Sequence, residues 1–327
     1  MDIDDRVYGM TTIDEPVLIE LIKSKPLQRL KGINQEGAAQ YIMDCKTVTR
    51  YDHSLGVMIL LKKFDASIEE QIAGLLHDVP HTAFSHVIDF VFRDNNHNQD
   101  FHETFYEKII LQSEIPAILK KYNYDTNRIL DDSNFSLLER PLPDLCADRI
   151  DYTLRDHISN YGFCDKITKY VSSFIVHNNE IIINDETIAK SFSEDYLNMN
   201  QNVWSHPLEV ASFQILADAI KIAMDEKILT EKDLFEDDLS VYTTLKESKN
   251  TKILDKLKML NPNLKIIDDP ADCDFHSRNK LRYINPKYVD PYGSINRVAD
   301  RFDDFSERLE KHKKWVERGN FVKIISY

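Results

Sequence analysis

Glycine is scarce in this chain, at 8 of 327 residues, and this scarcity constrains the possible folds more than any other feature. An average protein contains roughly 7% glycine. Many tight turns depend on glycine because it adopts backbone conformations that other residues avoid. A chain with so few glycines is expected to make long helices rather than many short strands. Its length is ample for a sizeable hydrophobic core.

Apolar residues recur at helical spacing along most of the chain. A proline at 26 is expected to divide the first of these segments, Ser67 is a candidate N-cap, and Pro143 suits a first helical turn. The predicted helices cover residues 14–33, 53–64, 67–77, 101–121, 143–160 and 208–227.

Strand-like sequences are short and lie mostly late in the chain. Two β-rich runs flank Asn178-Asn179, which predicts a hairpin at about 170–187. After residue 245 the segments NLKII, KLRYI and NFVKIIS predict strands beside a charged helix over 304–318. We therefore expect a mainly α protein, with a helical domain over 1–245 that carries the hairpin and a small mixed α/β subdomain over 246–327.

Charge and cysteine content exclude several classes of protein. The net charge of −14 disfavours non-specific binding to nucleic acids and anionic membranes. The four cysteines are scattered, as in reduced proteins, and form no zinc-finger pattern. The N-terminus lacks the apolar region of a secretory signal, and no apolar run reaches the ~18 residues of a membrane span. A cytoplasmic protein without membrane partners is expected.

Histidines are concentrated between residues 53 and 102, and the strongest signal among them is His77-Asp78 in LLHDVPHTAFSH. Adjacent residues on a helix point about 100° apart, so they rarely bind one ion together. Pro80 disfavours helical geometry at the residue before it. The apolar helix is therefore expected to end here, where the turning chain can bring both side chains to one metal ion.

Two further ligands complete a plausible metal site: His53, at the start of another apolar helix, and Asp148, in PLPDLCADRIDYTLRD. Two imidazoles and two carboxylates suit one divalent ion such as Mn, Fe, Co, Ni, Zn or Mg. Any one of these residues taken alone is more often a buried, hydrogen-bonded side chain than a ligand.

Five blocks of sequence carry a family resemblance: QRLKGINQEG, RYDHSLGV, HDVPHTAFSH, His102-Glu103 and DRIDYTLRD, in this order. They resemble the HD-domain phosphohydrolases, whose signature is H…HD…D. Among the HD-domain phosphohydrolases, the five blocks are similar to the branch of deoxynucleoside triphosphate triphosphohydrolases that includes the vertebrate SAM-and-HD-domain enzyme and bacterial dGTPases. The resemblance implies an HD-type helical core and metal ligands at His53, His77, Asp78 and Asp148.

The resemblance also implies roles for residues around the metal. His86 would act on the α-phosphate, oriented by Asp89, while His81 and His102 would contact phosphate oxygens. The expected substrate-binding residues are Arg50 and Arg149 for phosphate and Gln35, Tyr152 and Asp156 for the sugar. The ordinary alternatives are surface ion pairs for the arginines and a core position for Tyr152. His97 is expected to be a surface residue.

Two departures from the family pattern stand out. Proline at position 80 and Thr82-Ala83 replace a glycine-containing segment between the metal ligands and His86, so we expect the turn to be rebuilt around Pro80. Glu36 stands where these enzymes carry an apolar residue, and a carboxylate there could accept hydrogen bonds from the N–H groups of a base.

The resulting hypothesis is a metal-dependent phosphohydrolase that converts a (deoxy)nucleoside triphosphate to nucleoside and triphosphate, with a second Mg accompanying the triphosphate as a further option. A homo-oligomer is expected. Two alternatives remain open at this point: an HD phosphomonoesterase or phosphodiesterase for another small ligand, and a nucleotide-binding sensor with little turnover.

Overall fold

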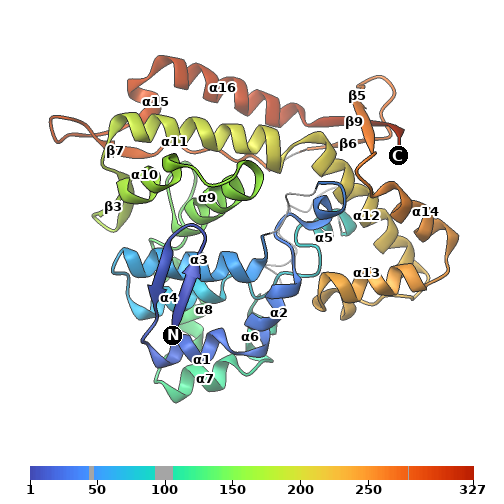
Figure 1. The fold of residues 1–327 in the computed structure, drawn as a ribbon, viewed down its shortest axis with the longest axis horizontal. Coiled ribbons are helices and arrows are strands. Elements are labelled where there is room, and N and C mark those ends of the chain that lie inside the picture. The colour runs from blue at the N-terminus through green and yellow to red at the C-terminus, as the bar shows by residue number, and fades with distance from the viewer. Residues whose placement is uncertain (44–47, 93–105, 279) are drawn as a thin grey trace.

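Helices dominate the structure, a computed structural model that describes residues 1–43, 48–92, 106–278 and 280–327 (Figure 1). The fold is mainly α, as the sequence predicted. Up to Tyr161 the elements are β1 (Asp2–Asp5), β2 (Gly9–Thr12), α1 (Pro16–Ile22), α2 (Lys25–Arg29), η1 (Leu30–Gly32), η2 (Gly37–Tyr41), α3 (Arg50–Lys63), α4 (Ile68–Leu76), α5 (Val87–Val91), α6 (Tyr106–Leu111), α7 (Ile115–Lys121), α8 (Thr126–Leu130), η4 (Asp132–Asn134) and α9 (Ala147–Tyr161).

The remaining elements alternate helices with short strands. They are α10 (Asp165–Ser173), β3 (Phe174–His177), β4 (Glu180–Ile183), α11 (Glu186–Met199), the π-helix η5 (Asn200–Trp204), α12 (Pro207–Asp225), η6 (Asp233–Phe235), α13 (Asp238–Glu247), α14 (Thr251–Met259), β5 (Lys265–Asp268), β6 (Phe275–Ser277), β7 (Lys287–Val289), β8 (Ile295–Arg297), α15 (Val298–Arg301), α16 (Asp303–Arg318) and β9 (Asn320–Ser326). No helix in the described parts of the chain is sufficiently long and apolar to span a membrane.

Several predicted elements are confirmed. Ser67 caps α4 by accepting a hydrogen bond from the backbone N–H of Glu70. The hairpin β3–β4 turns at Asn178 and Asn179, whose φ angles of 50° and 60° lie in the left-handed region that asparagine tolerates. The predicted C-terminal strand NFVKIIS is β9.

Three predictions of secondary structure were wrong. Helix α9 begins at Ala147 rather than 143, because Leu145 forms a β-bridge with Ile181 instead. The helix predicted over 101–121 is divided into α6 and α7, since the side chain of Ser113 accepts a hydrogen bond from the backbone N–H of Ile115. KLRYI, predicted as a strand, is an irregular segment without sheet pairing over residues 280–284.

Three small sheets surround the helical body. Strands β1 and β2 form an antiparallel pair, β3-β4-β7-β8 form a mixed sheet with β4 and β7 parallel, and β5-β9-β6 form an antiparallel sheet. Helix α16 contacts α11, and Figure 1 shows it lying along the outer side of that helix. Because β7 pairs with β4, the C-terminal part is joined directly to the hairpin; the boundary at residue 245 stays a prediction.

Helix α3 is the central element for the site. It is buried on all sides from His53 to Leu61 and contacts both α4 and α9. Two glycines permit this close packing: a Cβ on Gly56 would lie 1.9 Å from the Arg155 guanidinium of α9, and one on Gly74 would lie 2.5 Å from Leu61. The three helices can therefore present side chains to one point.

Candidate active site

The first turn of α3 positions His53. Thr49 and Asp52 form a reciprocal capping box, in which each side chain accepts a hydrogen bond from the other's backbone N–H. This cap fixes where α3 begins, and His53 follows one residue after Asp52. The side chain of His53 is 1% exposed.

The end of α4 positions the next two residues. The helix ends at Leu76, and residues 77–80 form a turn, as expected from the proline at position 80. The backbone carbonyl of Gly74 accepts a hydrogen bond from Nδ1 of His77 at 2.7 Å. Nε2 of His77 lies 3.5 Å from Oδ1 of Asp78, so the turn brings the two adjacent side chains together.

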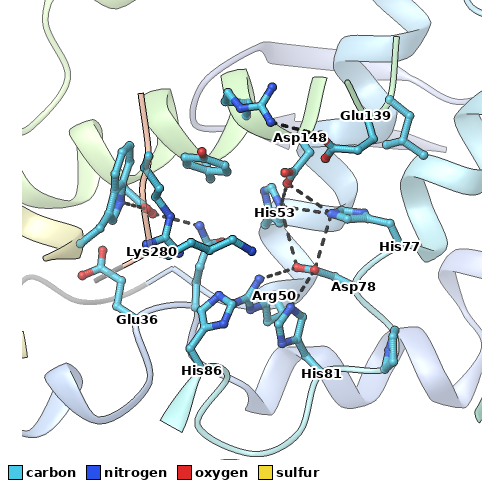
Figure 2. A pocket seen from close by; sticks show the side chains of 18 of the residues that line it. Glu36, Arg50, His53, His77, Asp78, His81, His86, Glu139, Asp148 and Lys280 are labelled. Atoms are coloured by element: carbon cyan, nitrogen blue, oxygen red, sulfur yellow. Dashed lines mark hydrogen bonds and ion pairs between the residues drawn. The ribbon is translucent and has the colours of Figure 1, made fainter. Parts of the chain in front are cut away.

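Asp148 completes the group from the first turn of α9. Its Oδ1 lies 2.9 Å from Nε2 of His53 and 3.5 Å from Nε2 of His77, and the two Nε2 atoms are 3.3 Å apart. Figure 2 shows these side chains converging with Asp78 on one point. The structure thus brings together all four residues predicted as metal ligands.

The donor set fits a divalent cation. Nδ1 of each histidine is engaged away from the cluster, by Asp151 for His53 and by Gly74 for His77. Both Nε2 atoms therefore face the cluster centre, as in imidazoles that ligate a metal. Burial lowers the pKa of His53, but hydrogen bonds with Asp148 and Asp151 outweigh this and raise the pKa to about 10. The cluster thus favours added positive charge, which a divalent ion would supply together with Lewis-acid stabilisation of phosphoryl oxygens.

A buried ion-pair chain holds His53 from behind. Oδ2 of Asp151 accepts a hydrogen bond from His53 Nδ1 at 2.7 Å, and Arg155 binds both Asp151 and Asp5 at 2.9 Å. Asp151 and Arg155 lie four residues apart on α9. Both are almost fully buried, and the carboxylate of Asp151 orients the candidate ligand His53.

His81 contacts Asp78, one of the four candidate metal ligands. Its Nε2 lies 3.1 Å from Oδ1 of Asp78, and its ring meets the ring of His86 edge to face. The sequence-based role of His81 was a phosphate contact. The contact with Asp78 indicates a second role for His81, because a hydrogen bond to the Asp78 carboxylate restrains the position of that side chain.

The bend between the metal ligands and His86 lies farther along the chain than predicted. Phe84 and Ser85 have φ angles of 60° and 51°, an uncommon conformation for residues other than glycine. Asp238 on α13 accepts a hydrogen bond from the backbone N–H of Phe84 at 2.6 Å, and Ser85 donates to the carbonyl of Asn34. Contacts from distant segments, rather than Pro80 alone, hold this turn.

His86 and Asp89 form the predicted pair. Nδ1 of His86 lies 3.2 Å from Oδ2 of Asp89, one helical turn on. Burial lowers the pKa of His86 below its ordinary value of 6.5, while the hydrogen bond that Asp89 accepts from it opposes this. The net shift favours the neutral imidazole in the absence of substrate.

The two arginines predicted to bind phosphate are both engaged by the protein. Arg50 donates to Asp78 and to Ser85, each at 2.9 Å. Arg149 donates to Glu139 at 3.1 Å and to two backbone carbonyls. Both line the cavity beside the candidate metal ligands, so their charge acts there even though some of their N–H groups are engaged by the protein.

The residues predicted for the sugar form one wall. Asp148, Tyr152 and Asp156 line the cavity from successive turns of α9. Asp156 accepts hydrogen bonds from Gln35 at 3.2 Å and from the indole of Trp204 at 2.8 Å. The hydroxyl of Tyr152 is hydrogen-bonded to that of Tyr196.

One cavity of about 620 Å³ joins these features. It is lined by every predicted site residue except Asp89, which lies behind His86, and His102, which falls outside the described residues together with His97. Glu36 also lines it, 4% exposed and hydrogen-bonded to Asn160.

Sequence reasoning missed the remaining lining residues. They include Tyr196 of α11, Trp204 of η5, Glu209 of α12, and Lys280 and Arg282 of the segment after β6. KLRYI was predicted only as a strand, and its positive charges were the one available signal of a role in the site.

The fold and the cavity define a helical protein with a His/Asp cluster that could hold a metal ion. Comparisons agree: the HD-domain family model matches residues 50–156. The chain is 41% identical to the uncharacterized protein YdhJ of Bacillus subtilis over 99% of both chains. It is 32% identical to the metal-dependent phosphohydrolase cns2 of Cordyceps militaris, over 76% of this chain and 74% of that protein.

More distant matches extend these findings. Mouse deoxynucleoside triphosphate triphosphohydrolase SAMHD1 is 32% identical over 36% of this chain and 21% of its own length. The crystal structure of the phosphohydrolase BT4208 from Bacteroides thetaiotaomicron superposes over both full chains with a TM-score of 0.70 at 19% identity, which indicates a shared fold. The chain belongs to the superfamily of HD-domain metal-dependent phosphohydrolases.

Proposed function

We propose that the protein hydrolyses nucleotides, and that its first candidate reaction converts a deoxynucleoside triphosphate to nucleoside and triphosphate. The observation that carries the proposal is that the cluster of four candidate ligands and the Gln35, Tyr152 and Asp156 wall line one cavity. A volume of about 620 Å³ is within the usual range of small-molecule sites. The partial likeness to SAMHD1 supports a nucleotide substrate.

In this proposal the side chains divide the work. His53, His77, Asp78 and Asp148 hold the divalent ion, and His86, oriented by Asp89, donates a proton to the leaving oxygen. An anionic phosphate beside His86 raises its pKa on binding, which favours the protonated donor. A second Mg would accompany a triphosphate. Association into a homo-oligomer stays a prediction.

A phosphomonoesterase is the second candidate, and one observation favours it. Arg50 and Arg149 are already bound to Asp78 and Glu139, so fewer guanidinium N–H groups remain for a long phosphate chain than the sequence suggested. A single phosphate needs fewer donors.

The test is a screen of the metal-loaded protein against all dNTPs, NTPs and nucleoside monophosphates, with separation of nucleoside, orthophosphate and triphosphate. Release of triphosphate supports the first candidate, and orthophosphate from monophosphates supports the second. The proposal is wrong when no nucleotide yields a phosphate product above the level of the His77→Ala variant.

A further inference from the structure

Arg282 differs from the other arginines that line the cavity. Arg50 and Arg149 are held by carboxylates and by neighbouring oxygens. Within the described residues, the Arg282 guanidinium has no hydrogen bond or ion pair with another side chain or with the backbone. The residue is half-buried in the cavity wall. A partly desolvated cation without a protein partner is suited to receive an anion.

The backbone of Arg282 is held by hydrogen bonds, whereas its guanidinium has no such partner in the described part of the chain. Its carbonyl accepts hydrogen bonds from Nδ2 of Asn200 at 3.1 Å and from Nε2 of His312 at 3.0 Å. Asn200 and His312 are fully buried. Oδ1 of Asn200 also accepts a hydrogen bond from Ser205, which lines the cavity. We call the two hydrogen bonds from Asn200 and His312 to the Arg282 carbonyl the clamp. The clamp fixes the backbone from which the guanidinium extends.

The position of Arg282 follows from the groups that its charge influences. It helps to lower the pKa of His86, and also acts on Tyr152 and Tyr196, which line the same cavity. Arg282 is therefore close enough to act electrostatically on both the histidine assigned to the phosphate and the tyrosine assigned to the sugar. Lys280 lines the same cavity, and Figure 2 shows it between Glu36 and the metal cluster.

We infer that Arg282 is a substrate-binding residue that holds a phosphate group of the ligand, supplied to the HD-domain site by the C-terminal part of the chain. The inference rests on the proposed function and assigns to Arg282 the task that the sequence gave to Arg50 and Arg149. A guanidinium can donate two parallel, charge-assisted hydrogen bonds to a phosphate.

The experiment measures binding of inorganic phosphate and inorganic triphosphate to the metal-loaded full chain by calorimetry. Arg282→Ala is expected to weaken binding of at least one of these anions roughly 10- to 100-fold, with binding of a phosphate-free nucleoside and the metal content unchanged. Arg282→Lys is expected to recover part of the loss because it keeps the charge. Arg301→Ala, an exposed arginine of α15 outside the cavity, is the charge-matched control and is expected to bind as the unaltered protein does.

The inference is overturned when the unaltered protein binds neither anion or when Arg282→Ala binds both anions as tightly as the control. It is also overturned when Arg282→Ala loses as much affinity for the nucleoside as for the anions. Failure of the proposed function would give a different result. In that case no nucleotide would be hydrolysed, although anion binding would still depend on Arg282. Thermal unfolding of both Arg282 variants, compared with the control, separates lost binding from lost folding.

Discussion

Two parts of the cavity wall are built in different ways. One part, the metal end, holds the four candidate ligands, which come from α3, the turn after α4 and the start of α9, and three of them (His53, His77 and Asp78) are each hydrogen-bonded by a further group. The other part, the Arg282 end, comes from the C-terminal part of the chain, and among the described residues Arg282 is hydrogen-bonded through its carbonyl. The metal end is preorganised around one ion, whereas the Arg282 end presents a cation whose partner has yet to bind.

Removing a metal ligand should have the largest effect. His77→Ala is expected to lower activity and bound metal by more than about 100-fold, because even residues behind a ligand typically account for 10- to 100-fold in metal affinity. Metal analysis and product release measure the two losses. His177→Ala, which alters an exposed histidine of the hairpin, should leave both unchanged. Retained metal in His77→Ala would contradict the assignment.

Loosening the support behind the metal end should come next. Asp151→Asn removes a charge that both orients His53 and pairs with Arg155. We expect metal affinity to fall about 10- to 100-fold and the free energy of unfolding to fall by about 3 kcal/mol, since a buried cation loses a partner. Metal titration and chemical denaturation measure these, with the exposed Asp300→Asn as control. Normal metal affinity would show that His53 does not depend on Asp151.

At the Arg282 end, the clamp can be weakened without touching the metal. Asn200→Ala removes one of two donors to the Arg282 carbonyl. KM is expected to rise several-fold while metal content stays constant, because one neutral hydrogen bond contributes about 1 kcal/mol. Steady-state kinetics compare it with Asn198→Ala on α11, whose side chain binds Arg308 away from the cavity. A loss of metal instead would mean that the two ends are not independent.

The smallest effect is expected from Asp89→Asn, which should change the pH dependence of kcat/KM. Asp89 raises the pKa of His86 against the lowering effect of burial, so its removal lowers that pKa further. With His86 as proton donor, kcat/KM falls as pH rises through the pKa of His86. The variant should therefore show this fall at lower pH and lose several-fold activity at pH 7. A profile identical to that of the unaltered protein would exclude His86 as the titrating group.

The sequence was informative where chemistry is local. The helix end at Leu76 followed from Pro80, and His77 and Asp78 lie where that end predicts. Five ordered blocks then indicated His53 and Asp148 through the family resemblance. Each of these signals lies within a few residues of the side chain concerned.

The rest depends on contacts between distant segments. Nothing near Asp151 indicates that it orients His53, because that depends on how closely α3 and α9 pack at Gly56. The engagement of Arg50 by Ser85 depends on a left-handed turn held by Asp238. KLRYI has the composition of a strand, but its backbone is bound by Asn200 and His312 rather than by a neighbouring strand.

Because Arg282 lies late in the sequence, it is synthesised well after the candidate metal ligands. During synthesis all four metal ligands have emerged once α9 is made, whereas Arg282 and His312 follow much later. At typical rates of elongation this interval is on the order of ten seconds. In a nascent chain the four candidate metal ligands can therefore come together before Arg282, the cation assigned to phosphate, has been synthesised. Metal binding would then precede the completion of the substrate-binding site.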